Sequence, residues 1–194
     1  MRKPNPASHA IQRAHLIQAA RRSFSRAGFD GASTESVRVE ANTSTGKLFH
    51  YFPNKQSLIL AVVEDHIRSS QLWLNELEDH DDADKALRLL LKVIIEAAAD
   101  PEERRLILEI SAATSRDKEI AGLSAQADKA LSQTITALIA GNKRTFLLPN
   151  DQMTVLLSTW IDGVFSRAET DAAFDPQQML ATMNNLLEIL QRQQ

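Results

Sequence analysis

Between residues 28 and 55 the sequence ends a helix and starts the next one three times. Gly28 follows an apolar stripe of helical spacing, and glycine readily adopts the left-handed conformation that terminates a helix. Ser33 and Ser44 can each cap a new helix, because a serine hydroxyl accepts an otherwise unpaired backbone N–H. Pro53 ends the third helix and Asn54 caps a fourth. Two short helices joined by a tight turn, behind a longer helix, predict a helix-turn-helix.

Helical periodicity continues through the rest of the chain, without a convincing strand. Asp84 can cap the fifth helix, and Asp100 followed by Pro101 is a strong start signal for the sixth. The sequence therefore predicts an all-α fold, with residues 1–54 as a three-helix helix-turn-helix domain and residues 55–194 as a six-helix domain. The nine predicted helices span about 9–27, 34–41, 45–51, 55–79, 84–99, 101–114, 116–140, 151–170 and 176–191.

Composition is that of a globular protein and excludes several kinds of site. Hydrophobic residues make up 43% and charged residues 24% of the chain, and there is no cysteine. Disulfides, thiolate nucleophiles and cysteine-based metal sites are thereby excluded. The five histidines lack the spacing of metal ligands, so we expect neither a metal nor a cofactor. No segment reads as a signal peptide or approaches the ~18 apolar residues of a membrane span, so we expect a cytoplasmic protein.

Charge is distributed unevenly along the chain. Residues 1–55 contain nine Lys and Arg against Asp30, Glu35 and Glu40, a balance of +6, whereas the remainder carries −9. A basic head on an acidic body concentrates the attraction for phosphate at one end. The alternative is an ordinary domain with a solvated basic helix.

Several linked motifs lie in the first third of the chain: RAHLIQAA at 13–20, GFDG at 28–31 and STGKLFHYFPNK at 44–55. Together they resemble the N-terminal domain of the TetR family of transcriptional regulators. The resemblance is detailed over about residues 13–63, and beyond these it covers only the number and order of helices. It implies a homodimer on a pseudo-palindromic DNA operator, with repression as the usual outcome. It also implies a small-molecule effector and a dimer interface in the body.

The third helix is the expected recognition helix. Gly46 removes a side chain where the helix must approach DNA closely, and Thr45 and Lys47 can read base edges in the major groove. Lys55 at a helix N-terminus, with Ser33 and Thr34, can contact phosphates. The expected DNA-binding residues are Ser33, Thr34, Arg38, Ser44, Thr45, Gly46, Lys47, Phe49, His50, Tyr51 and Lys55.

Five positions depart from the family pattern. Glu35 stands where some members carry a base-reading arginine, and it can either accept from cytosine N4 or face solvent. Arg38 replaces a small residue and must extend outward, so that either the helix packing is looser or Arg38 gains a phosphate. Asn42 and Thr43 replace the usual Gly-Val of the turn. In addition, Phe49 lacks the usual tyrosine hydroxyl.

The body offers candidates for an effector pocket. His66, Ser70 and Trp73 share one face of the fourth helix and can form a pocket wall, or they can be ordinary core residues. Glu109 is a second polar candidate, although a solvent-facing salt bridge is the alternative. Trp160 and Phe165 can line the same pocket. The long fourth helix is the expected transmitter between pocket and head.

The last two helices carry more apolar surface than one neighbour can cover. The resemblance implies that they pair with their copies in a four-helix dimer interface; core packing within the chain is the alternative. The sequence shows neither a nucleophile–base pair nor a phosphate loop, so an enzyme is not expected. The expected interface residues are Leu156, Trp160, Ile161, Val164, Met183, Leu186, Leu187 and Leu190.

Overall fold

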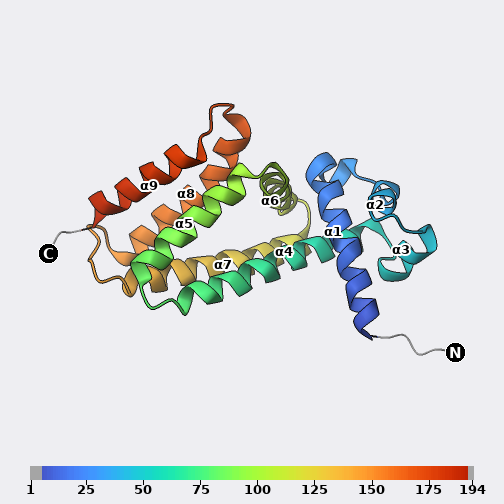
Figure 1. Ribbon diagram of the computed structural model, residues 1–194, viewed down its shortest axis with the longest axis horizontal. Coiled ribbons are helices and arrows are strands. Elements are labelled where there is room, and N and C mark those ends of the chain that lie inside the picture. The colour runs from blue at the N-terminus through green and yellow to red at the C-terminus, as the bar shows by residue number, and fades with distance from the viewer. Residues whose placement is uncertain (1–5, 192–194) are drawn as a thin grey trace.

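The computed structural model describes residues 6–191, and its regular structure in that range is helical throughout (Figure 1). The all-α prediction is confirmed, and so are the nine helices within the described range. Phe146 and Gln191 form an isolated antiparallel bridge. The helices are α1 (Pro6–Gly31), α2 (Thr34–Glu40), α3 (Thr45–Tyr51), α4 (Lys55–Glu78), α5 (Ala83–Ala99), α6 (Pro101–Ala113), α7 (Lys118–Ala140), α8 (Asn150–Thr170) and α9 (Pro176–Leu190).

Helices α2, α3 and α4 begin at the caps that the sequence predicts. The Ser33 hydroxyl accepts from the backbone N–H of Ser36 at 3.0 Å, and that of Ser44 accepts from the N–H of Lys47 at 3.2 Å. Asn54 Oδ1 accepts from the N–H of Ser57 at 2.8 Å. These caps satisfy N–H groups that have no partner within the first turn of a helix.

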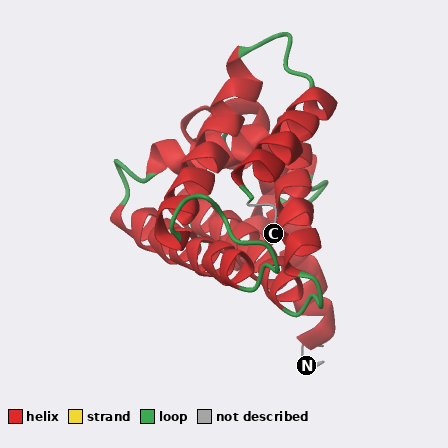
Figure 2. Ribbon diagram, turned by 90° about the vertical axis from the view of Figure 1, so that its left-hand side faces the viewer, coloured by secondary structure: helices red, strands yellow, loops and turns green. Residues whose placement is uncertain are grey.

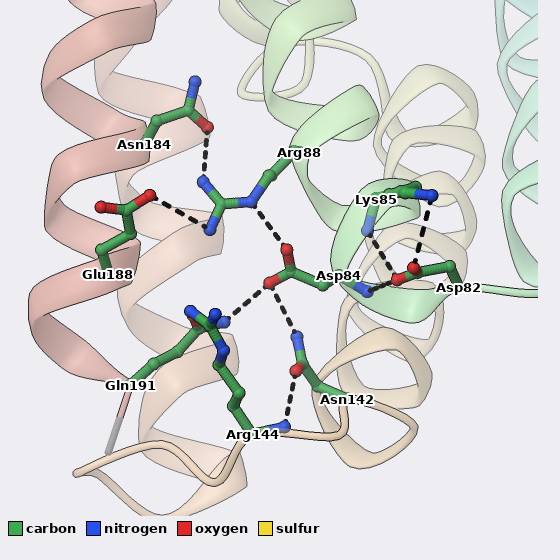
Figure 3. Close-up of polar contacts among 9 residues, drawn as sticks. All are labelled: Asp82, Asp84, Lys85, Arg88, Asn142, Arg144, Asn184, Glu188 and Gln191. Atoms are coloured by element: carbon green, nitrogen blue, oxygen red, sulfur yellow. Dashed lines mark hydrogen bonds and ion pairs between the residues drawn. The ribbon is translucent and has the colours of Figure 1, made fainter. Parts of the chain in front are cut away.

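The predicted cap of α5 is wrong. Asp82 caps the helix, because its Oδ1 accepts from the N–H groups of Asp84 and Lys85 at 3.1 and 3.2 Å. Asp84 lies inside the first turn, and its carboxylate points to other elements. It accepts from Arg88 Nε at 2.8 Å, Asn142 Nδ2 at 3.2 Å and Gln191 Nε2 at 2.8 Å (Figure 3).

We call this group of contacts around Asp84 the Asp84 clasp. It joins the start of α5, the connector between α7 and α8, and the end of α9 (Figure 3). Burial by itself raises the pKa of Asp84, but hydrogen bonds from Arg88, Gln191 and Asn142 outweigh it and lower the pKa. The clasp therefore holds a charged carboxylate at neutral pH, and it fixes the end of the molecule that lies farthest from α3 (Figure 1).

The three helices α1, α2 and α3 form a head at one end, and α4 leads from it along the body beside α7 (Figure 1). Figure 2 views the molecule from the end of the body that lies away from the head, and the regular structure seen there consists of helices joined by loops. None of the helices in the described range combines the length and apolarity that crossing a membrane requires. The described side chains also include no group of three His, Asp or Glu residues placed to share a metal ion.

The hydrophobic core consists of two clusters, and the division between them does not follow residue 54. The first cluster contains the apolar side chains of the head, such as Phe24 and Leu48, together with Leu58 of α4, Leu106 of α6 and Ile120 of α7. The second fills the far part of the body. Since burial of apolar surface is the main stabilising contribution, the head is stabilised partly by helices that belong to the body in sequence.

Candidate DNA-binding surface and its link to the body

Helix α3 lies on the surface and is held there by its apolar side. Leu48 and Phe52 are buried in the first core cluster, as the (i, i+4) spacing predicts. Thr45, Lys47 and His50 are exposed. The first turn of this helix is therefore open to a partner, and its orientation is set by buried contacts.

Gly46 is not required by the packing of the protein. A Cβ added at Gly46 would meet no atom of the described residues within 4 Å, and the backbone there has no positive φ. A glycine costs roughly 0.5–1 kcal/mol relative to alanine within a helix. Its presence is explained if something outside the chain approaches α3 closely.

The turn between α2 and α3 depends on Asn42, the one non-glycine residue with a positive φ, 45°, in the described range. Asparagine tolerates this left-handed conformation, as the sequence predicts. The N–H of Asn42 donates to the carbonyl of Val39 at 3.0 Å, and that of Thr43 donates to Arg38 O at 3.1 Å. The replacement of the usual Gly-Val therefore preserves a tight turn.

Arg38 extends outward, as expected, but it has partners in the protein itself. Its Nε and one terminal nitrogen donate to the two carboxylate oxygens of Glu35 at 2.8 and 2.6 Å, and the other terminal nitrogen donates to Thr43 O at 3.0 Å. Glu35 is 65% exposed. The sequence alternatives for Glu35, cytosine or solvent, did not include this ion pair.

The expected phosphate contacts of the head lie at its surface. Ser33 is exposed and Thr34 is half-buried beside it. Lys55 is half-buried, and its Nζ donates to the backbone carbonyl of Asp30 at 2.9 Å. Because an ammonium group has three donors, this contact leaves Lys55 able to donate to a phosphate as well.

An aromatic cluster that the sequence analysis missed lies at the end of α3. The ring of His9 in α1 lies 4.5 Å from that of Tyr51 and 6.3 Å from that of His50. His15 lies farther along α1, and its Nε2 is 2.9 Å from the carbonyl oxygen of Ala41. Helix α1 therefore supports both ends of the helix-turn-helix, and the spacing of the two histidines gave no local signal of this.

Several basic residues of the head are paired with acidic side chains. Arg22 Nε lies 2.7 Å from Glu40 Oε1, and Arg26 pairs with the other oxygen of the same carboxylate. Lys47, in contrast, is exposed, with no ion pair among the described residues. Arg2 and Lys3, which contribute to the basic balance of the head, lie outside the described residues. Fewer cationic side chains of the head are therefore unpaired than the balance of +6 over residues 1–55 suggests.

The head is tied to the body through Glu103 of α6. Its carboxylate pairs with Arg21 of α1, and its Oε1 lies 3.3 Å from Nδ1 of His66 in α4. Burial by itself raises the pKa of Glu103, but His66 and Arg21 outweigh it and lower the pKa to about 2. One charged side chain thus joins three helices. His66, which we expected in a pocket wall, belongs to this junction.

A second contact between α6 and α1 is made by Glu109. Its Oε1 accepts from the backbone N–H of Phe29 at 2.8 Å. The bond lies beside Gly28, which has φ 72° and would place an added Cβ 3.2 Å from the carboxylate. The sequence alternative of a solvent-facing salt bridge for Glu109 is wrong, because its partner is a backbone amide of α1. The other alternative, a place in the effector pocket, stays a prediction.

Of the other candidate pocket residues, the structure places three at the second core cluster, and Ser70 bonds within its own helix. Ser70 Oγ donates to the backbone carbonyl of His66 at 3.0 Å, whereas Trp73 and Trp160 are half-buried against the second core cluster. Phe165 is buried in that cluster. The sequence analysis missed two buried hydroxyl oxygens, Ser124 Oγ and Ser158 Oγ, which have no hydrogen-bond partner among the described residues.

Exposed apolar side chains lie on α8, on α9 and in the connector before α8. Ile189 is 70% and Val155 66% exposed. The C-terminal patch, as we call it, consists of Leu147, Val155, Leu156, Leu186 and Ile189.

Half of the eight expected interface residues face the protein's own core instead. Ile161, Val164, Met183 and Leu187 are buried in the second cluster. A side chain buried in this way has almost no surface to offer a partner. Leu156 and Leu186 are exposed, and Trp160 and Leu190 are half-buried.

Fold and site together define a helix-turn-helix protein whose exposed helix α3 is carried by an all-helical body. Residues 16–62 match the profile of the bacterial regulatory proteins of the tetR family. This match supports the resemblance to the TetR family that the sequence shows over about residues 13–63.

Comparison with curated proteins extends the similarity beyond the head. The HTH-type transcriptional regulator BetI of Burkholderia thailandensis is 35% identical over 97 residues, which are 50% of this chain and 49% of the relative. BetI of Burkholderia ambifaria is 36% identical over the same length and shares. The matched region thus spans about half the length of the curated relatives.

Solved structures of low sequence identity share the whole fold. A putative transcriptional regulator from Saccharomonospora viridis, solved in complex with choline, matches with a TM-score of 0.81 at 20% identity, over 96% of this chain and 100% of that one. A TetR transcription regulator from Haloarcula marismortui matches with a TM-score of 0.80 at 19% identity, over 94% and 100% of the two chains.

Proposed function

We propose that the protein is a homodimeric transcriptional repressor that binds a pseudo-palindromic DNA operator and is released from it by a small-molecule effector. The observation that carries the proposal is the first turn of α3, where Gly46 has no packing role and Lys47 is exposed beside it. A helix with a slim, cationic first turn fits the major groove of DNA. Two copies would place two such helices on successive faces of the duplex.

The DNA contacts divide by role. In the proposed complex Thr45 and Lys47 read base edges, while Ser33, Thr34 and Lys55 contact phosphates. A mobility-shift assay on DNA from upstream of the protein's own gene tests binding. Lys47→Ala should relax base preference and cost roughly 1–3 kcal/mol of binding free energy. Lys55→Ala should weaken all sequences alike and lower the salt slope by about one unit. Unchanged binding by both variants would refute these roles.

The proposed partner on the C-terminal patch is a second copy of the chain. Exposed apolar side chains on both α8 and α9 match the four-helix interface that the family resemblance implies. Sedimentation of the wild type should show a dimer, and Ile189→Lys should shift it toward monomer. Leu72→Lys is the matched control, because Leu72 is also a largely exposed aliphatic residue but lies on α4. A monomeric wild type at all usable concentrations would refute the proposal.

We propose a small organic cation as the effector. The body is acidic, Trp73 and Trp160 are half-buried in it, and aromatic rings attract cations. The neighbour from Saccharomonospora viridis was solved with choline, which makes choline the first ligand to test. Its neutral isostere 3,3-dimethylbutan-1-ol is the matched control. Calorimetry should show binding of choline and not of the alcohol; equal binding of both, or of neither, would refute a cationic effector of this kind.

The buried hydroxyls supply a second part of the effector proposal. Buried polar atoms without partners are rare in folded proteins, because each forfeits a hydrogen bond that it makes with water. We assign Ser124 and Ser158 to contacts with the effector. Ser158→Ala should lower effector affinity and leave the thermal midpoint of the free protein unchanged or higher.

Release from DNA follows from differential binding. An effector that binds the body better at one separation of the two heads shifts the population toward that separation, by no more than its difference in affinity. From the sequence we expect α4 to transmit the effector's binding from the pocket to the head. We propose that α6 shares this transmission, since Glu103 and Glu109 link α6 directly to α1.

A further inference from the structure

Arg38 and Glu35 form a pair that the family pattern does not contain. The usual residue at position 38 is small, yet here a guanidinium lies between α2 and the turn that leads into α3. All of its hydrogen bonds to described residues lie within the head: two to Glu35 and one to Thr43 O. Such a bidentate arrangement is geometrically specific, because the fork of N–H groups matches the two oxygens of a carboxylate.

The carbonyl of Thr43 is a sensitive place for such a contact. Thr43 lies between Asn42, whose φ is 45°, and Ser44, whose hydroxyl caps α3. A bond to this carbonyl limits rotation of the peptide that sets the direction of α3. Few residues of α2 contact α3 otherwise, and the buried apolar contribution of α2 itself is Val37. A polar contact therefore adds a constraint where apolar packing is slight.

Glu35 determines where the guanidinium goes. Its carboxylate occupies the Nε edge of Arg38, which is the edge that would grip a phosphate. The hydrogen bond from Arg38 lowers the pKa of Glu35, and that bond raises the pKa of Arg38. Both groups consequently stay charged at neutral pH, and the pair adds no net charge to the DNA-facing surface.

We infer that Arg38 is a positioning residue for the recognition helix, and that Glu35 retains its guanidinium on the turn and away from the phosphate backbone. This inference rests on the proposed DNA binding. It gives Arg38 a part in specificity, through the direction of α3, and none in the general attraction for DNA.

The test compares the operator with random-sequence DNA over a range of salt concentrations. Arg38→Ala should weaken operator binding by about ten-fold more than it weakens binding to random DNA, the effect of one hydrogen bond to a charged group. Its effect on random DNA and on the salt slope should be no larger than that of Arg26→Ala, which also removes one positive charge. Arg38→Lys should not restore binding, because one ammonium cannot hold Glu35 and Thr43 O in the same geometry. Arg26→Ala is the matched control for loss of one positive charge in the head.

Glu35→Gln tests the retaining role. Without the carboxylate, Arg38 should reach a phosphate, so that affinity for random DNA rises and the salt slope steepens by about one unit. The double variant Glu35→Gln/Arg38→Ala should lose that gain. If Arg38→Ala instead lowers the salt slope by about one unit and weakens both DNAs alike, Arg38 is a phosphate contact and the inference is overturned. An unchanged affinity in Glu35→Gln overturns it as well.

Hydrogen exchange tests the positioning of α3 by Arg38 in the absence of DNA. Arg38→Ala should speed amide exchange in residues 43–51, and leave exchange in the body as in the wild type. Unchanged exchange in 43–51 overturns the inference even if the protein binds DNA. A wild type that binds no DNA refutes the proposed function, whereas faster exchange in the variant would still support the positioning of α3 by Arg38.

Discussion

Replacement of Glu103 by glutamine tests how the head is held on the body. The substitution keeps the size of the side chain and removes its charge, so the contacts with Arg21 of α1 and His66 of α4 lose their ionic character. We expect the variant to fold, because the apolar packing around α6 is unchanged. The free energy of unfolding should fall, and the size of the decrease can be worked out from the pKa.

The pKa of Glu103 is lowered from 4.5 to about 2. A difference of one pKa unit corresponds to about 1.4 kcal/mol, so complete enclosure would give about 3 kcal/mol of stabilisation. The side chain is 27% exposed, and screening by solvent reduces this to about 1.5 kcal/mol. Because the folded-state pKa is depressed, the stabilisation is complete above the unfolded pKa near 4.5 and is lost as the pH falls toward 2.

Urea denaturation followed by circular dichroism, at fixed protein concentration, measures this difference. Wild type and Glu103→Gln should differ by about 1.5 kcal/mol at pH 7, and the difference should shrink steadily below pH 4.5. Glu102→Gln is the matched control, since Glu102 is an exposed neighbour in the same helical turn. A difference that persists undiminished at pH 3, or one no larger than that of the control at pH 7, would refute the reasoning.

Three further substitutions test other parts of the structure. Gly28→Ala should lower stability by about 1–2 kcal/mol in thermal denaturation, because φ is positive there and the new Cβ crowds Glu109; an unaffected midpoint would contradict this. Leu48→Ala should cost about 2–4 kcal/mol in urea titration and abolish operator binding, since Leu48 is buried under α3; tight binding by the variant would show that α3 needs no such support. Asp84→Ala should speed amide exchange in residues 142–147. It should also lower the free energy of unfolding by about 1–3 kcal/mol, because the partners of the Asp84 clasp are left unpaired. Faster exchange in α5 alone would contradict the role given to the clasp.

The sequence predicted the helix-turn-helix well because its signals are local. Ser33, Ser44 and Asn54 each cap a helix through an amide only a few residues away, and Asn42 adopts its left-handed conformation within the turn itself. Asp82 and Asp84 show the limit of such signals. Both could cap α5, and the choice depends on Asn142 and Gln191, which are distant in sequence.

The head–body junction could not be predicted from local patterns. Glu103 and Arg21 are 82 residues apart, and Glu109 and Phe29 are 80 residues apart. Nothing in either neighbourhood indicates the partner. The pair of Glu35 and Arg38 is different, because their (i, i+3) spacing on one helix was a readable signal that the sequence analysis did not use.

The apolar periodicity of α8 and α9 identified the helices but not their partners. Ile161, Val164, Met183 and Leu187 lie on inner faces, while Val155 and Ile189 lie on outer ones. A helical stripe shows that a face is apolar, and it does not show whether the same chain or another copy covers it. Only the three-dimensional arrangement separates the two sets.

The two carboxylates of α6 bear on how far this protein is modular. A chimaera spliced at residue 54, with this head grafted onto an unrelated body, would leave Arg21 without its acid and the amide of Phe29 without its acceptor. Such a graft would need acidic side chains recreated at the equivalents of Glu103 and Glu109. For the same reason, substitutions in α1 and α6 should accompany one another as the protein diverges, although the two helices lie far apart in the chain.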